Sequence, residues 1–206
     1  MAEIGAIILA AGMSSRMGSA KQFLPLGEKP LFRHAVDRAV ASGLAPILVV
    51  GGEHHEKLRE QTSDLPQVEV FHNPHYATGM ASSLACGIRA MTGKADAVLV
   101  FLADQPYVPG QVIQALVDTY RQQRDAGVRI VRPLYAGEAG HPVLFDAALF
   151  AELAQVTGDQ GGKEVVSQYK QHLRTIPFER AEWGLDVDTP DDYRRIQKAP
   201  GCDRED

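Results

Sequence analysis

The sequence predicts a single α/β domain in which a mostly parallel sheet lies between two layers of helices, a three-layer αβα sandwich. Two observations lead to this fold class. The run from Ile4 to Ala11 carries no charge, which suits a strand buried on both faces of a parallel sheet. Strand-like and helix-like segments then alternate through two thirds of the chain, and this alternation favours helices on both faces with right-handed crossovers.

Length and composition fit this class. The chain has 206 residues, of which 45% are hydrophobic and 23% charged, as in soluble globular proteins. We expect one domain over 1–199 and a disordered tail over 200–206. The formal net charge of -5 gives no basic footprint for nucleic acid. Because no signal peptide and no apolar stretch of membrane-spanning length is seen, we also expect a cytoplasmic protein without a membrane partner.

In the first half of the chain, sequence patterns predict several helices and strands after the opening strand. Apolar residues recur at helical spacing from Pro30 until Gly43, which predicts a helix begun by proline and ended by glycine. The next three segments are, in chain order, a strand over 47–50 that ends in two glycines, a charged helix over 53–61 and a short strand over 68–71.

The second half continues the alternation and then changes character. A helix of small residues over 81–91, a charge-poor strand over 95–102, a helix over 110–124 and a strand over 128–131 are predicted. From 135 to 145, glycines and a Pro-Val-Leu-Phe strand predict a hairpin beside the main sheet that covers a second substrate. The elements together predict a Rossmann-like fold with a small β-hairpin extension.

The last third is predicted to hold short helices and loops. Asp146 is typical of the N-cap of a helix that runs to Ala154. A glycine-rich loop over 157–162 leads to another short helix, and the final helix opens at Asp188-Thr189-Pro190, where either Asp188 or Thr189 would be the cap and proline the first turn.

The loop after the first strand has the composition of an anion site. Gly12 frees the backbone to turn, and Ser14, Ser15, Arg16 and Lys21 supply donors and positive charge. The P-loop motif does not match, because it requires Gly-Lys-Ser/Thr at its end and Gly18 is followed by Ser-Ala. The dinucleotide-binding motif does not match either, because it requires three glycines and only Gly12 and Gly18, six positions apart, are available. ATPase, kinase and dehydrogenase functions are therefore disfavoured. A phosphate-binding loop and an ordinary strand-to-helix loop with surface cations both stay open.

Asp104 is the strongest candidate for a metal ligand. It follows a buried strand, so its carboxylate is expected at the carboxyl edge of the sheet, where ligands bind in such folds. Mg2+ prefers one or two protein carboxylates plus phosphate oxygens and water, although a turn-capping aspartate is the alternative. The second acid is open: Asp186 and Asp188 share a face if the segment is extended, while Asp191 and Asp192 also suit a helix start.

These residues together resemble the molybdenum cofactor nucleotidyltransferases. The resemblance implies a fold like that of the nucleotide-diphospho-sugar transferases. The resemblance rests first on Leu9-Ala10-Ala11-Gly12-Met13-Ser14-Ser15-Arg16-Met17-Gly18 with Lys21, on the Asp104-Gln105-Pro106 turn and on the Asp-Thr-Pro-Asp-Asp segment. The cytidylyltransferase branch is resembled by Asn73-Pro74, by Gly79-Met80-Ala81-Ser82-Ser83-Leu84, by Gly140-His141-Pro142-Val143-Leu144-Phe145 and by Gly158-Asp159-Gln160-Gly161-Gly162. The match runs from residue 4 to about 195.

The resemblance implies an enzyme that joins CTP to the phosphate of molybdopterin and releases pyrophosphate. Arg16 and Lys21 would then act on the triphosphate, Asp104 and Asp188 would hold Mg2+, and His141 and Asp159 would face the pterin. Nucleotide contacts are implied for a further set of residues, Leu9, Ala10, Ala11, Gly12, Asn73, Gly79 and Ser82. Ala11 favours CTP, because the guanylyltransferase branch usually has glycine there. The Gln22-Phe23-Leu24-Pro25 segment departs from the pair of leucines common in the family.

Several alternatives stay open from the residues. A same-fold enzyme could use GTP or another acceptor, such as a sugar or methylerythritol phosphate, and a non-catalytic carrier could bind the same cofactor. His141 could simply be satisfied by backbone, Asn73 could belong to a surface loop and Ser82 could cap a helix. A molybdoenzyme or its chaperone would be the recipient of the product.

Overall fold

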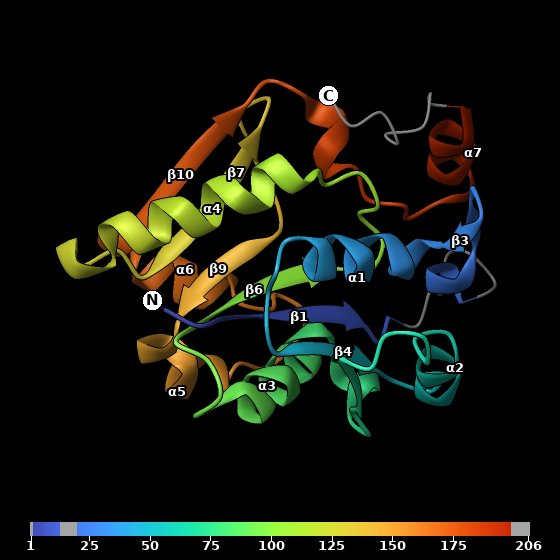
Figure 1. Cartoon of the computed structure of the whole chain (residues 1–206), viewed down its shortest axis with the longest axis horizontal. Coiled ribbons are helices and arrows are strands. Elements are labelled where there is room, and N and C mark those ends of the chain that lie inside the picture. Colours follow the sequence, from blue (N-terminus) through green and yellow to red (C-terminus); the bar gives the residue numbers. More distant parts are fainter. Residues whose placement is uncertain (1, 13–19, 199–206) are drawn as a thin grey trace.

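The computed structural model describes residues 2–12 and 20–198, which form an eight-stranded, mostly parallel sheet with helices on both faces (Figure 1). The α/β class and the three-layer arrangement predicted from the sequence are confirmed. Across the sheet the strands lie in the order β10 (Leu173–Phe178), β7 (Ile130–Tyr135), β9 (Val143–Asp146), β6 (Ala97–Leu102), β1 (Ile4–Ala10), β4 (Ile47–Gly51) and β5 (Val68–His72), and β8 (Glu138–Ala139) pairs with β7.

The helices divide the hydrophobic core between the two faces of the sheet. One face packs against α1 (Leu31–Ala41), α2 (His55–Glu60) and α4 (Gly110–Gln123). The other packs against α3 (Met80–Met91), α5 (Phe150–Leu153) and α6 (Lys163–Gln168). A small third cluster joins α7 (Pro190–Lys198) to α1 through Ile196, Val187 and Leu31. In the described part of the chain, no helix combines the length and apolarity needed to cross a membrane.

The central strand β1 explains why the opening run carries no charge. It pairs in parallel with β4 and β6, and Ile7 and Ile8 are fully buried in the two opposite cores. Helix α3 approaches this strand closely because Gly87 has no side chain, and a Cβ there would lie 2.7 Å from Ile7. Parallel pairing brings the carboxyl ends of β1, β4 and β6 to one edge of the sheet.

The strand predicted from Pro-Val-Leu-Phe forms but does not lie beside the main sheet. As β9 it is inserted between β6 and β7 and runs antiparallel to both. All four of its residues are buried, including Asp146, which accepts hydrogen bonds from the Ala148 amide and the Tyr120 hydroxyl. The hairpin extension is instead the β7–β8 pair. The helix predicted over 146–154 is a 3-10 turn over Ala147–Leu149 followed by the short α5.

Three strands, β2 (Pro25–Leu26), β3 (Lys29–Pro30) and β10, have no counterpart in the sequence prediction, whose last strand segments lie within 128–145. Strand β10 lies at the sheet edge and contains Arg174, Thr175 and Pro177, so it lacks the apolar run used to find the others. The two-residue strands β2 and β3 form a separate tight hairpin before α1. The tail over 200–206, predicted to be disordered, lies outside the described residues.

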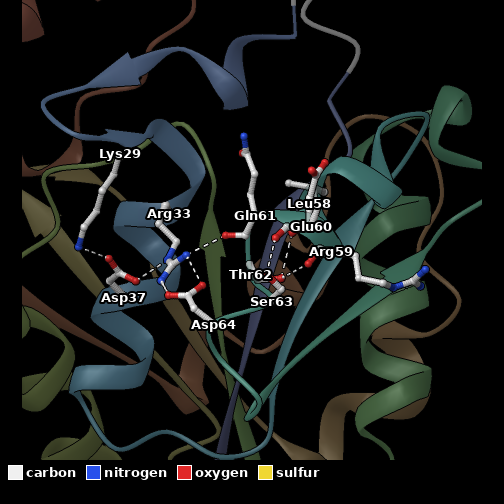
Figure 2. Close-up of polar contacts among 10 residues, drawn as sticks. All are labelled: Lys29, Arg33, Asp37, Leu58, Arg59, Glu60, Gln61, Thr62, Ser63 and Asp64. Atoms are coloured by element: carbon white, nitrogen blue, oxygen red, sulfur yellow. Dashed lines mark hydrogen bonds and ion pairs between the residues drawn. The ribbon is translucent and has the colours of Figure 1, made fainter.

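Arg33 joins α1 to the segment that follows α2 (Figure 2). Its guanidinium donates to Asp37 at 2.7 Å, to the Gln61 carbonyl at 2.7 Å and to Asp64 at 2.9 Å and 2.5 Å. Lys29 also pairs with Asp37. The Arg33 side chain is 14% exposed, so its bonds to Asp37 and to the Gln61 carbonyl are partly buried, whereas the Asp64 carboxylate is 62% exposed. The network holds α1 against the segment that follows α2.

Replacing Arg33 with Met is expected to lower the free energy of unfolding by about 2 kcal/mol, because two partly buried acceptors, Asp37 and the Gln61 carbonyl, lose a charged donor. Arg59→Met is the matched control, since the exposed Arg59 side chain pairs with Glu56 one turn away and points away from the network. It should cost at most about 0.5 kcal/mol. Urea unfolding monitored by circular dichroism measures both, and equal losses would contradict the structural role of Arg33.

Candidate active site

A cavity of about 770 Å3 opens at the carboxyl edge of the sheet, on the face that carries α3 and α6. Its walls come from the ends of β1, β6 and β7, from the start of α3, from the 158–163 segment and from the segment before α7. The described residues that line it include Lys21 with Asp104 and Asp188 at one end, and Arg132 and Lys163 at the other. It therefore has the size and polarity of a site for two charged small molecules.

Lys21, Asp104 and Asp188 meet at the first end of this cavity. The Lys21 ammonium donates to Asp104 at 2.5 Å and to Asp188 at 2.7 Å. Lys21 and Asp104 side chains are 15% and 19% exposed, and Asp188 is 41% exposed. Burial disfavours the charge of Lys21, but the two carboxylates outweigh burial and raise its pKa above the ordinary value. Lys21 therefore stays charged and balances the two acids.

The backbone holds these groups together. The Val187 amide donates to the Asp104 carbonyl at 3.0 Å, which fixes the segment before α7 against the turn after β6. Asp186, on the same segment, accepts from Gln105 at 2.8 Å and also lines the cavity. Desolvation at the cavity wall and the nearby Asp104 carboxylate raise the pKa of Asp186. The choice between Asp186 and Asp188 as second metal ligand stays a prediction.

The acids at the start of α7 have different roles. Thr189 accepts from the Asp192 amide at 3.2 Å, while Asp192 accepts from the Thr189 amide at 2.9 Å. This reciprocal pair is a capping arrangement, with Thr189 as the N-cap. Asp192 is thus a structural residue, whereas the Asp188 carboxylate is directed to Lys21.

The end of β1 and the start of the loop after it contribute four predicted residues to the cavity wall, Leu9, Ala10, Ala11 and Gly12. Gln22, which is buried, donates to the Ala10 carbonyl at 3.4 Å and ties the chain before and after the loop together. Arg16, predicted to act on the triphosphate, and Ser14 and Ser15 lie outside the described residues.

Asn73 and Ser82 lie next to the cavity wall but not in it. Asn73 is buried and donates to Ser82 at 2.9 Å and to Ser83 at 3.0 Å, and its side-chain oxygen accepts from the His75 amide. Ser83 lines the cavity. The network positions the start of α3, and direct contact of Asn73 or Ser82 with a nucleotide stays a prediction.

Gly79 and Asp159 lie side by side in the cavity wall. Gly79 has φ +113°, and a Cβ there would meet Asp159 Oδ1 at 2.3 Å and the Gly158 carbonyl at 2.5 Å. The Ala81 amide also donates to the Gly158 carbonyl, at 3.1 Å. Glycine at 79 is required for this close approach, which holds the 158–162 segment against α3.

The second end of the cavity is built around His141. Tyr135 donates to the His141 carbonyl at 2.8 Å, and a Cβ at Gly140 would lie 2.4 Å from the Tyr135 ring. Glycine therefore precedes the histidine because the ring occupies that space. Within the part of the chain that the structure describes, neither ring nitrogen of His141 has a hydrogen-bond partner. Burial, then the charges of Arg132 and Lys163, lower the pKa of His141 to about 4.

Sequence reasoning missed Arg132, Tyr135 and Lys163, which also line this end. Arg132 was detectable in principle, since it is the single charge in the strand Ile-Val-Arg-Pro-Leu-Tyr. Tyr135 gave no signal, because its importance comes from packing against Gly140 and against Gly184, which is distant in sequence.

The donor set near Lys21 suits a divalent cation that binds together with phosphates. Among residues 2–12 and 20–198, no three His, Cys, Asp or Glu side chains form a group that could hold a metal by themselves. Asp104 and Asp188 instead provide a pair of carboxylates separated by one ammonium. Such a sparse pair fits Mg2+, which relies on substrate phosphates and water for its remaining ligands.

The glycine loop, the lysine and the paired aspartates at this sheet edge are groups that can bind phosphates and a divalent cation. The chain belongs to the family described as the MobA-like NTP transferase domain, whose model matches residues 6–173, and the protein is therefore a nucleotidyltransferase.

Relatives and solved structures agree with this family. Molybdenum cofactor cytidylyltransferase of Escherichia coli K12 is 28% identical over 196 residues, 94% of this chain and 95% of that protein. Nicotine blue oxidoreductase of Paenarthrobacter nicotinovorans is 26% identical over 92% of this chain and 94% of its own length. The crystal structure of Rv0371c from Mycobacterium tuberculosis H37Rv superposes with a TM-score of 0.83 at 28% identity, covering 96% and 99% of the two chains. The same protein in complex with manganese gives a TM-score of 0.78 at 27% identity, covering 96% and 100%.

Protonation of His141 is expected to make the protein less stable in mild acid. Because its native pKa is about 4 and its unfolded value is 6.5, the unfolded chain binds the extra proton first as pH falls between these values. Wild type should therefore lose about 1 to 2 kcal/mol more stability from pH 7 to pH 5 than His141→Asn does. Urea unfolding of both proteins at each pH provides the comparison. An identical loss in the two proteins would refute the low native pKa.

Proposed function

We propose that the protein transfers CMP from CTP to the phosphate of molybdopterin, giving molybdopterin cytosine dinucleotide and pyrophosphate in a Mg2+-dependent reaction. The observation that carries the proposal is the convergence of Lys21, Asp104 and Asp188 beside the Ala11-Gly12 loop. The similarity to the cytidylyltransferase of Escherichia coli over nearly the whole chain supports the choice of substrates.

The chemistry requires positioning more than proton transfer. A phosphate monoester has a second pKa near 6, so the attacking oxygen is largely anionic at neutral pH and needs little help from a base. The demand is to bring two anions together and to stabilise charge on the transferred phosphoryl group and on the leaving pyrophosphate. Lys21 and Arg16, with the amides of the loop at Gly12, are assigned to the triphosphate.

Lys21 has two roles in this scheme. In the free protein its ammonium neutralises Asp104 and Asp188. On CTP binding it turns to the triphosphate and leaves both carboxylates available to hold Mg2+. The bound cation would supply charge stabilisation at the phosphoryl oxygens. The crystal structure of the Rv0371c relative in complex with manganese supports a role for a divalent cation in the proposed reaction.

Ala11 is assigned to base selection. It lies in the cavity wall and is 8% exposed, so its methyl group is part of a tightly packed surface beside the loop. A methyl group limits the space for a base more than a hydrogen does, which favours the smaller cytosine over guanine. A cytoplasmic location and transfer of the product to a molybdoenzyme or its chaperone belong to the same proposal.

The central assay uses purified protein, MgCl2 and molybdenum-loaded pterin with each nucleoside triphosphate in turn. Cytosine dinucleotide should form with CTP. Asp104→Asn should lower kcat/KM about 100-fold or more, because the site loses a carboxylate needed for charge stabilisation. Asp191→Asn is the matched control: this exposed acid at the start of α7 pairs with Arg194, and its loss should change the rate less than about twofold.

Other outcomes of this assay separate the alternatives. Product from GTP alone would replace the cytidine assignment, and turnover of a sugar phosphate or methylerythritol phosphate alone would replace the acceptor. Tight cofactor binding without turnover of any nucleotide would indicate a carrier. Full activity of Asp104→Asn would refute its metal role.

Ala11→Gly should reduce the preference for CTP over GTP by about tenfold, roughly 1.4 kcal/mol, because the space beside the base increases. The ratio of kcat/KM values for the two nucleotides measures the change. Ala139→Gly is a suitable control, since Ala139 lines the far part of the cavity in β8. A CTP preference that survives Ala11→Gly intact would refute the role of this methyl group.

A further inference from the structure

Arg132 is a cation in the cavity wall, and no acidic side chain among residues 2–12 and 20–198 forms an ion pair with it. It lies in β7 between the buried residues Val131 and Pro133 and is itself partly buried. Its Nε is buried and has no hydrogen-bond partner among the described residues. Its one hydrogen bond there is a long one of 3.4 Å to the Gly140 carbonyl. Burial lowers the pKa of Arg132, as expected when no carboxylate compensates the charge.

A partly buried guanidinium without an acidic partner has a free-energy cost, which an anionic ligand would offset by neutralising the charge. Taking a charge out of water costs several kcal/mol if nothing pairs with it. The cavity also contains Lys163, and both cations lower the pKa of His141, so this end is electropositive. The acids that line the same cavity are Asp104, Glu138, Asp159, Asp186 and Asp188, but none of them forms an ion pair with Arg132 within the described chain. The geometry and charge both favour an anionic ligand.

This cationic end is separate from the Lys21 end. In the sheet, Val143 of β9 pairs with Val100 of β6. On the other side of β9, Leu144 pairs with Val131 of β7. Because β7 and β9 are antiparallel, the next residue of β7, Arg132, lies level with Val143. Arg132 is thus two strand spacings, about 10 Å, from β6. Asp104 lies in the turn two residues beyond the end of β6 at Leu102, further toward the carboxyl edge of the sheet. Arg132 and Asp104 therefore line different parts of the cavity wall.

We infer that Arg132, together with Lys163, binds a second anionic group of the acceptor substrate, remote from the phosphate that reacts, and thereby selects the acceptor. The inference rests on the proposed function for the identity of that substrate. In a molybdenum-bearing pterin the metal centre, with its oxygen and sulfur ligands, is such a group. A small sugar phosphate has no second anion and would leave Arg132 unpaired.

The test compares Arg132→Gln and Lys163→Gln with Arg174→Gln. Arg174 is the matched control, because it lies on the neighbouring strand β10 and donates to Gln123 of α4, on the opposite face of the sheet. The KM for molybdenum-loaded pterin should rise 10- to 100-fold in Arg132→Gln and less in Lys163→Gln, the loss expected for one charged hydrogen-bonding group. The KM for CTP should stay within twofold, and Arg174→Gln should match wild type.

Two further readouts do not depend on turnover. Tungstate, a tetrahedral oxyanion, should raise the melting temperature of wild type and Arg174→Gln but not of Arg132→Gln. In buffer without oxyanions, Arg132→Gln should melt at the wild-type temperature or above, since it removes an unpaired buried charge. A lowered melting temperature together with changes in both KM values would mean a structural role and would overturn the inference.

The failures are distinguishable. If wild type forms cytosine dinucleotide and Arg132→Gln keeps the wild-type acceptor KM, the inference fails while the proposed function stands. If wild type does not use the pterin at all, the proposed function fails, and the tungstate shift alone decides whether Arg132 binds an anion. Loss of that shift in Arg132→Gln supports the anion site, and its retention overturns it.

Discussion

The ion pairs of Lys21 with Asp104 and Asp188 are the interaction on which the site depends. They join three segments that are far apart in the sequence: the chain after the β1 loop, the turn after β6 and the segment before α7. Two acids this close to each other would repel without the ammonium between them. The same neutralisation allows the carboxyl edge of a buried sheet to hold acidic groups before any substrate arrives.

The opposite end of the cavity has the complementary charge. There, Arg132 and Lys163 line the wall and His141 stays neutral because burial and the two cations disfavour its protonation. Close packing builds this end, since Gly140 and Gly184 leave room for the Tyr135 ring and Gly79 leaves room for Asp159. One cavity with two separate charged ends is suited to substrates that each carry an anion, as the proposed reaction requires.

The features of the structure that depend on local sequence patterns were predicted from the sequence. Apolar runs located β1, β4 and β6, and the position of Asp104 after such a run predicted that it reaches the carboxyl edge. The placement of β9 inside the sheet and the existence of β10 depend on pairing between distant segments, which hydrophobic periodicity does not encode. For the same reason, the sequence predicts only that Lys21 binds phosphate. It does not predict the ion pairs of Lys21 with Asp104 and Asp188, which lie far from it in the sequence.

Manganese binding to wild type and Lys21→Met, without nucleotide, tests the role of this ammonium most directly. Calorimetric titration should give a several-fold lower Kd for Mn2+ in Lys21→Met, because two carboxylates at the site lose their internal cation. The same variant should bind CTP more weakly, since Lys21 is assigned to the triphosphate. An unchanged or higher Kd for Mn2+ in Lys21→Met would contradict the proposal that Lys21 and the metal share Asp104 and Asp188.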